Sequence, residues 1–294
     1  IRDLQHTLAA PARFCGVGLH TGVPVNLVLR PAPANTGIVF KRKDLEGFMI
    51  RAKAGNVARV SYATSLMRKG VLISTTEHLL SALAALGVDN VVAEIDNLEV
   101  PIMDGSAVPF AAEIARVGLR RQRAKQTCLQ IIKPVEVIEE SKQIAIYPSE
   151  AFRVTYTIDF PHPRIGLQTM EFEPSSAAYL NEIAPARTFG FFDEVETLRK
   201  AGLVRGGSLE NAVVLSRDGI LNSEGLRFPD EFCRHKILDL IGDLALVGHP
   251  IAGHVVAHRG GHAMHYALVS RLLTEREAWR LVQSSYLQPQ TSAA

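Results

Sequence analysis

Three side chains suited to metal binding or proton transfer stand at four-residue intervals in the stretch DEFCRHKILDLIGDLALVGHP. They are His235, Asp239 and Asp243, at positions i, i+4 and i+8. On an α-helix this spacing places all three on one face. A histidine and an aspartate one turn apart form a good two-point metal chelate, although a solvated polar face of an amphipathic helix shows the same pattern. Phe232 and Leu246 share that face, which suits the wall of a cleft better than open water.

A third metal ligand has to come from elsewhere, because a catalytic zinc commonly has three protein ligands and one open position. The obvious candidate is His78, in STTEHLLSALAAL. Glu77 would then lie beside the metal, where a general base that activates water belongs. The alternative is structural: Ser74 and Glu77 match a capping box at the start of a helix, which leaves His78 as an incidental first-turn residue.

Another histidine, His262, follows a glycine pair in AHRGGHAMHYAL. We expect a strand to end before Gly260 and Gly261 and a helix to begin at His262. Close approach of the glycine backbone to a substrate would make His262 a general acid, with Asp243 holding it charged. An ordinary glycine-rich turn with an exposed histidine has the same sequence.

Weaker candidates lie in three other motifs. In APARTFGFF, Thr188 offers a hydroxyl to a developing oxyanion, although Phe189 and the two later phenylalanines also fit core packing. His20 in GVGLHTG and Asp104 in PIMDGSAVP lie in turns marked by glycine or proline, where Asp104 is equally suited to cap the following helix.

The elements that must position these residues follow one order twice. The first half has the strands VPVNLVLRP and GIVFKRK, the helix of His78, the strand NVVAEID and a helix over 108–117. The second half has strands in CLQIIKPVEVIE, KQIAIYP and FRVTYTIDF, a helix over 177–183, a long helix over 229–246, the strand GHVVAH and a helix from His262. This order predicts an α+β fold of two similar domains, each a sheet covered by helices.

The boundary between the two domains is predicted at the segment GLRRQRAKQ. It is polar and basic and shows no apolar period, so we interpret it as a solvated linker. The first domain then covers 1–124, the second covers 125–288, and 289–294 form a tail.

Composition excludes several classes of protein. The net charge of +2 lacks the basic excess of a nucleic-acid-binding protein, and 47% hydrophobic and 21% charged residues are ordinary for a globular chain. The cysteines are far apart and read as reduced thiols. We find no membrane-spanning run or signal peptide, and we expect a cytoplasmic monomer.

Seven motifs, taken in order, resemble the UDP-3-O-acyl-N-acetylglucosamine deacetylases, zinc enzymes of lipid A biosynthesis in Gram-negative bacteria. They are GVGLHTG, STTEHLLSAL, PIMDGSAVPF, RTFGF, LVRGGSLENAVVL, HKILDLIGDLALVG and GGHAMH. The resemblance implies two similar two-layer α/β sandwich domains, with their helices packed face to face and the active site between them. It also implies a small-molecule substrate, UDP-3-O-acyl-N-acetylglucosamine.

The resemblance assigns a role to each candidate. It implies zinc on His78, His235 and Asp239, although two histidines and a carboxylate also suit ferrous iron. Glu77 resembles the general base, His262 the general acid with Asp243 as its partner, and Thr188 the oxyanion donor. The sequence is equally compatible with Glu77 handling both protons itself.

Substrate contacts are also implied by the resemblance. Lys236 and Arg259 match basic residues near the diphosphate, although the family also has lysine at the position of Arg259. Phe160 matches a residue that stacks on uracil. An insert at 194–208 matches one that lines an apolar passage for the acyl chain, here with Leu198, Leu203 and Val204. Leu19, His20 and Phe189 complete the predicted substrate contacts.

The expected reaction removes the N-acetyl group to give UDP-3-O-acyl-glucosamine and acetate, which is the committed step of lipid A biosynthesis in that family. Two other classes compete with it. A non-catalytic sugar-nucleotide-binding protein would bind no stoichiometric zinc. A metallopeptidase is disfavoured by the missing HExxH motif and by the insert.

Overall fold

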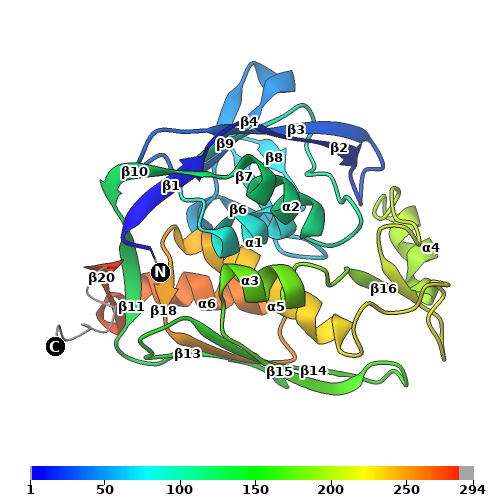
Figure 1. Cartoon of the computed structure of the whole chain (residues 1–294). Coiled ribbons are helices and arrows are strands. Elements are labelled where there is room, and N and C mark those ends of the chain that lie inside the picture. Colours follow the sequence, from blue (N-terminus) through cyan, green and yellow to red (C-terminus); the bar gives the residue numbers. More distant parts are fainter. Residues whose placement is uncertain (1, 285–294) are drawn as a thin grey trace.

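Two five-stranded sheets lie on opposite sides of the molecule, with helices packed between them (Figure 1). The computed structural model describes residues 2–284. The upper sheet in Figure 1 comes from the first half of the chain and the lower sheet from the second half.

The first sheet has the strand order β2-β3-β9-β4-β5. All of its neighbouring strands are antiparallel except β4 and β9. Its strands are Ala12–Val17 (β2), Pro24–Pro31 (β3), Ile38–Arg42 (β4), Phe48–Arg51 (β5) and Val91–Ile95 (β9), and its helices are Glu77–Leu86 (α1) and Val108–Val117 (α2). We call this sheet with its two helices the first unit.

The second sheet repeats this topology, with the order β12-β13-β19-β14-β15. Again one neighbouring pair, β14 and β19, is parallel and the others are antiparallel. Its strands are Val135–Glu139 (β12), Lys142–Tyr147 (β13), Arg153–Phe160 (β14), Gly166–Phe172 (β15) and His254–His258 (β19), and its helices are Glu231–Leu244 (α5) and His262–Thr274 (α6). This second unit confirms the predicted α+β fold with a repeated element order.

The hydrophobic pattern of the strands explains why the sheets face inward. In β3, Val25, Leu27 and Leu29 are buried and alternate with residues that are mostly exposed. In β14, Val154, Tyr156 and Ile158 are likewise buried at every second position. Because side chains alternate between the two faces of a strand, each sheet presents one apolar face to the helices that cover it.

The helices α1 and α5 meet at the centre of the molecule, where the two units are joined. Gly242 allows their close approach, since a Cβ atom there would lie 2.1 Å from the backbone oxygen of Glu77. A residue with a side chain at 242 would push the two helices apart. The glycine therefore sets the depth at which side chains from α1 and α5 face each other.

Each unit carries an insert before its first helix. In the first unit it is a three-stranded sheet of Val57–Arg59 (β6), Ser65–Arg68 (β7) and Val71–Ile73 (β8). In the second unit it includes Ser176–Ala178 (α3), a π-helical turn over Tyr179–Ile183, Phe189–Phe191 (β16), Phe192–Lys200 (α4) and Val213–Leu215 (β17). The remaining strands are Leu4–Leu8 (β1), Leu119–Lys125 (β10), Thr127–Ile131 (β11), Ile251–Ala252 (β18) and Trp279–Gln283 (β20).

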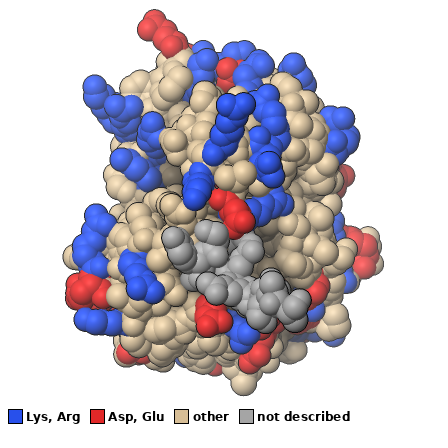
Figure 2. All heavy atoms as spheres, turned by 60° about the vertical axis from the view of Figure 1, so that its left-hand side comes forward, with Lys and Arg blue, Asp and Glu red and all other residues tan. Residues whose placement is uncertain are grey.

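The segment GLRRQRAKQ is not a linker, so this prediction is wrong. Leu119–Lys125 forms the strand β10, which pairs antiparallel with β1. Its inward position Gln122 is polar and bonds the Asn90 side chain and the Ala32 carbonyl, which hides the period of two from a hydrophobicity pattern. Figure 2 brings this edge forward and shows lysine and arginine gathered over the upper half of that face.

The division at 124 and 125 remains a prediction, and the predicted tail at 289–294 lies outside the described residues. Among residues 2–284, no helix is both long enough and apolar enough to cross a membrane.

Candidate metal centre and catalytic site

A cavity of about 340 Å³ opens between the two units at the first turn of α1. Its lining brings together residues from distant parts of the chain. The predicted site residues that line it are Leu19, Glu77, His78, Thr188, Phe189, His235, Lys236, Asp239, Arg259 and His262. A larger cavity of about 510 Å³ lies at the other end of α1 and α5, lined mostly by small and apolar residues.

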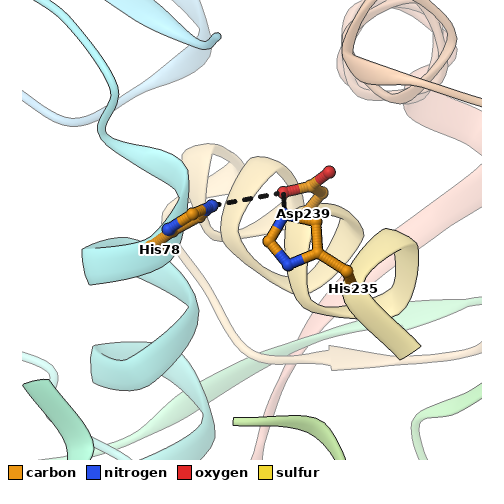
Figure 3. Close-up of side chains that lie close together, drawn as sticks. All are labelled: His78, His235 and Asp239. Atoms are coloured by element: carbon orange, nitrogen blue, oxygen red, sulfur yellow. Dashed lines mark ion pairs between the residues drawn. The ribbon is translucent and has the colours of Figure 1, made fainter. Parts of the chain in front are cut away.

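His78, His235 and Asp239 converge at the wall of the smaller cavity (Figure 3). His78 projects from the first turn of α1, and the other two project from successive turns of α5. The Oδ1 atom of Asp239 lies 3.4 Å from Nε2 of His235 and 3.7 Å from Nε2 of His78. All three side chains are buried, and their donor atoms lie within 4.8 Å of one another.

The hydrogen bonds around this cluster leave its inward atoms available to a cation. Nδ1 of His235 lies 2.9 Å from the Ala186 carbonyl, which places the proton on Nδ1 and leaves the Nε2 lone pair facing the cluster. Oδ2 of Asp239 accepts from Lys236, whereas its Oδ1, buried between the two histidines, has no hydrogen-bond partner among the described residues. A buried carboxylate oxygen without a partner fits a metal ligand.

The ionisation states of the three donors also suit a metal ion. Burial, helped by the nearby His235, lowers the pKa of His78 to about 3. Burial also lowers the pKa of His235. Burial alone would raise the pKa of Asp239, but Lys236 and the surrounding histidines hold it well below its usual range. Neutral imidazoles and an ionised carboxylate are the forms that bind metals.

Glu77 stands beside this cluster and does not close a capping box. Its Oε2 accepts a hydrogen bond of 3.0 Å from the backbone N–H of Thr64, while the Ser74 hydroxyl bonds Ser65 instead. The N-cap position of α1 is Thr76, which makes no side-chain capping bond. Burial, opposed in part by His262, raises the pKa of Glu77 to about 7. A carboxylate with such a pKa is well suited to accept a proton near neutral pH.

His262 faces Glu77 from the second unit, at the first residue of α6. Its Nε2 lies 3.8 Å from Oε1 of Glu77, and its Nδ1 lies 2.7 Å from Oδ2 of Asp243. Burial alone would lower the pKa of His262, but the carboxylates of Asp243 and Asp239 raise it to about 9. His262 is therefore positioned to hold a proton.

A second histidine on Asp243 was not found from the sequence. Nδ1 of His265 lies 2.8 Å from Oδ2 of Asp243, and its Nε2 lies 2.8 Å from the hydroxyl of Tyr156. Burial lowers the pKa of His265, so it is neutral, donates to Asp243 and accepts from Tyr156. The only signal in the sequence is that His265 follows His262 by one helical turn in GGHAMHYAL.

Thr188 reaches the cavity because its neighbours are fixed on both sides. Its N–H bonds the Gly105 carbonyl, and its own carbonyl accepts from Val213 of β17. The preceding residue, Arg187, is buried and pairs with Glu231 at the start of α5, with 2.9 Å between Nε and Oε1. The loop of Thr188 is thereby tied to the helix that carries His235.

The two predicted phosphate-binding residues line the cavity but already have partners. Nζ of Lys236 lies 2.9 Å from Oδ2 of Asp239 and 5.5 Å from the ring centre of Phe189. Nη2 of Arg259 lies 2.5 Å from Oδ2 of Asp159. A third cationic residue on the lining, Lys142, was not predicted, because β13 reads only as an alternating strand.

Other predicted substrate contacts do not line this cavity. His20 is buried, and its backbone N–H bonds Glu99. Phe160 packs edge-on against Phe189 with 5.7 Å between ring centres, so it stands one layer behind the lining. Leu198 and Leu203 are half-buried in and after α4.

The insert nevertheless contacts the cavity wall through its backbone. Gly206 donates to the carbonyl of Leu19, and Arg205 donates to the carbonyl of His20. Leu19 lines the cavity, so the insert lies directly behind one of its apolar walls.

Two further structural alternatives raised by the sequence are wrong. The polar stripe of α5 is not solvated, because His235, Asp239 and Asp243 are buried between the units together with the apolar side of the helix. Asp104 does not cap α2, whose N-cap is Ala107 without a side-chain bond. It bonds Ser106 and pairs with Arg227 instead.

Comparison with known proteins gives one consistent result. Residues 5–274 match the family model described as UDP-3-O-acyl N-acetylglycosamine deacetylase. The UDP-3-O-acyl-N-acetylglucosamine deacetylase of Solibacter usitatus is 51% identical to this chain over 290 residues. The match covers 99% of this chain and 98% of that relative. Proteins of the same name from Myxococcus xanthus and Phenylobacterium zucineum are each 49% identical, covering 95% and 94% of this chain and 89% and 96% of their own.

Proposed function

We propose a catalytic role for each residue around the cavity, from the premise that this chain belongs to the UDP-3-O-acyl N-acetylglycosamine deacetylase family. The chain is a hydrolase that removes the N-acetyl group from UDP-3-O-acyl-N-acetylglucosamine in lipid A biosynthesis. The products are acetate and a UDP-sugar with a free amine. The assignments below concern how this chain performs that reaction.

The metal is held by His78, His235 and Asp239. The observation that carries this assignment is the convergence of two imidazole nitrogens on a buried carboxylate oxygen without a hydrogen-bond partner among the described residues. We propose zinc, because two nitrogen donors and one oxygen donor are a common catalytic zinc set, with ferrous iron as the alternative. When bound there, zinc would polarise the acetamide carbonyl and make a water more acidic.

Glu77 then accepts a proton from the attacking water as the new C–O bond forms at the acetyl carbon. The Thr188 hydroxyl donates to the oxygen that becomes negative. His262 donates a proton to the amine nitrogen as the C–N bond breaks, and Asp243 holds the imidazole charged and oriented. The opposed positions of Glu77 and His262, with raised pKa values of about 7 and about 9, support this division of labour.

Substrate binding is assigned from the lining of the cavity. Lys236 and Arg259 bear charges that suit a diphosphate, and Phe189 and Leu19 supply apolar surface. Phe160 would reach the substrate only with a shift of Phe189, which lies in front of it, and His20 is not on the lining of this cavity. The passage for the acyl chain lies along the insert, past Leu198 and Leu203, behind the wall made by Leu19.

Three broader features belong to this proposal. The chain needs no second copy to build the site, because the candidate ligands and the lining residues all lie within it, and we propose that it acts as a monomer. It acts in the cytoplasm, where its cysteines, which form no disulfide, stay reduced. Its substrate is a small molecule and not a nucleic acid.

The direct test is acetate release from UDP-3-O-acyl-N-acetylglucosamine, measured before chelation, after chelation and after zinc is restored. We expect activity to disappear with the chelator and to return with the metal. A folded, zinc-loaded protein that releases no acetate would contradict the proposed reaction.

A further inference from the structure

Thr64 touches both halves of the catalytic apparatus from a position behind the cavity. It lies in the loop between β6 and β7, in the insert of the first unit, and is 1% exposed. It is not among the residues that line the cavity. Nothing in its sequence context, SYATSLM, marks it as functional.

Each polar group of Thr64 has a partner. Its N–H donates to Oε2 of Glu77 at 3.0 Å, and its hydroxyl donates to Oδ1 of Asp243 at 2.6 Å. Its carbonyl accepts from the hydroxyl of Thr76 at 3.0 Å and from the N–H of Thr76 at 3.2 Å. Because Thr76 is the N-cap residue of α1, the loop of Thr64 is fixed to the start of that helix.

The hydroxyl of Thr64 completes the hydrogen bonding of the Asp243 carboxylate. Oδ2 of Asp243 accepts from both His262 and His265, and Oδ1 accepts from Thr64. A carboxylate bonded through a single oxygen is free to rotate about its last C–C bond, whereas one bonded through both oxygens has its plane fixed. The plane of Asp243 in turn fixes the ring of His262, whose Nδ1 also lies 3.3 Å from the Thr64 hydroxyl.

We propose that Thr64 is a positioning residue that holds the base and the acid at a fixed separation across the two units. Its backbone sets one oxygen of Glu77, and its side chain sets the carboxylate that orients His262. Gly242 is next to Asp243 and allows α1 and α5 to approach closely enough for this bridge to form. This inference rests on the proposed function, in which Glu77 and His262 transfer protons.

The test compares Thr64→Val, which removes only the hydroxyl, with Thr64→Ser, which keeps it. We expect Thr64→Val to lower kcat about 10- to 100-fold with KM within about twofold, because small misplacement of catalytic groups costs rate and not binding. Thr64→Ser should recover most of that loss. A matched control is Thr7→Val, which removes an equally buried hydroxyl bonded to the Asn90 carbonyl, far from the site. It should leave kcat unchanged.

A double-mutant cycle with Asp243→Asn identifies the path of the effect. If Thr64 acts through Asp243, Thr64→Val should cost much less kcat in the Asp243→Asn background than in the wild-type chain. The same cycle measured by unfolding in denaturant should show coupling between the two positions without reference to activity. Thr7→Val should be additive with Asp243→Asn in both measurements.

Two results would overturn the inference in distinguishable ways. An active wild-type enzyme with unchanged kcat in Thr64→Val, or with equal losses in both backgrounds, would contradict the role of Thr64 alone. A metal-loaded wild-type chain without deacetylase activity would remove the proposed function and this inference together.

Discussion

The first and second units share one topology but contribute different chemistry. Both place a first helix against the other unit and a second helix beside it, and both have one parallel pair of strands at the same place in the sheet. The first unit supplies Glu77 and His78 at the start of α1, and the second supplies His235 and Asp239 from α5. The second helices differ most: α6 begins at His262, whereas α2 begins at the apolar Val108.

This difference indicates that the repeated frame fixes where helices meet and leaves the side chains free to specialise. The inserts follow the same logic, since each is placed before the first helix of its unit and each brings one threonine to the site. The first insert brings Thr64 behind the catalytic groups, and the second brings Thr188 to the cavity itself. Breaking one contribution at a time should therefore separate metal binding, proton transfer and positioning.

The largest effect is expected for Glu77, the proposed base, which comes from the first unit. Glu77→Gln should lower kcat about 10³- to 10⁴-fold, because the amide cannot accept the proton of the water. Zinc content should stay at the wild-type level, since Glu77 is not a predicted ligand. Steady-state acetate release and metal analysis on the same sample check both statements. Near-full activity in Glu77→Gln would exclude it as the base.

The corresponding change in the second unit is His262→Gln. It should lower kcat about 10²-fold and retain zinc, because a glutamine donates hydrogen bonds but no proton to the leaving amine. Comparison with Glu77→Gln under identical conditions is informative. If His262→Gln retained wild-type kcat, Glu77 would handle both protons, and the assignment of His262 as the general acid would be wrong.

The sequence alone indicated some residues of the site but not the contact between its two units. His262, His235 and Asp239 are local signals, because a helix start or an i, i+4 spacing is legible in a short stretch. Thr64 and Asp243 are 179 positions apart in the chain, and only the meeting of the two units brings them together. No periodicity carries that information.

Other failures of the sequence reasoning have local physical causes. Gln122 turns a polar side chain inward and so conceals the strand β10, while Ser74 pairs with Ser65 and leaves the apparent capping box unused. The repeated order of strands and helices was legible because alternating and helical apolar patterns survive in both units.

Arg187 tests whether the second insert depends on its buried ion pair. Arg187→Met should lower the free energy of unfolding by about 3–5 kcal/mol, because it leaves the fully buried Glu231 carboxylate without its cationic partner. Glu231→Gln in the same background should restore part of the loss by removing the isolated charge. Denaturant unfolding measures both, and a loss below about 1 kcal/mol would show that the backbone N–H groups of residues 187 and 227 suffice to hold the Glu231 carboxylate.

The pH dependence of kcat should show one limb from each unit, an acidic limb from Glu77 and an alkaline limb from His262. The proposed mechanism needs Glu77 ionised and His262 protonated, so activity should rise as pH passes about 7 and fall as pH passes about 9. A bound metal would add positive charge next to Glu77 and should move the acidic limb below 7. His262→Gln should remove the alkaline limb. Its persistence in that variant would assign the limb to another group.

The smallest effect among these is expected for Tyr156, at the far end of the bonds that lead through His265 to Asp243. Tyr156→Phe should change kcat less than about threefold, because Asp243 keeps its other donors. Stopped-time acetate assays resolve such a change. A loss as large as that of His262→Gln would mean that His265 depends on this hydroxyl for its tautomer.

The central claim is that one metal ion is held jointly by the two units. The most direct measurement is metal content per chain, by mass spectrometry after equilibration with limiting zinc, in the wild-type chain and in His78→Gln and Asp239→Asn. We predict one ion per wild-type chain and greatly reduced occupancy in both variants, since each unit supplies a ligand. Full occupancy in His78→Gln would contradict the claim, because the site would then belong to the second unit alone.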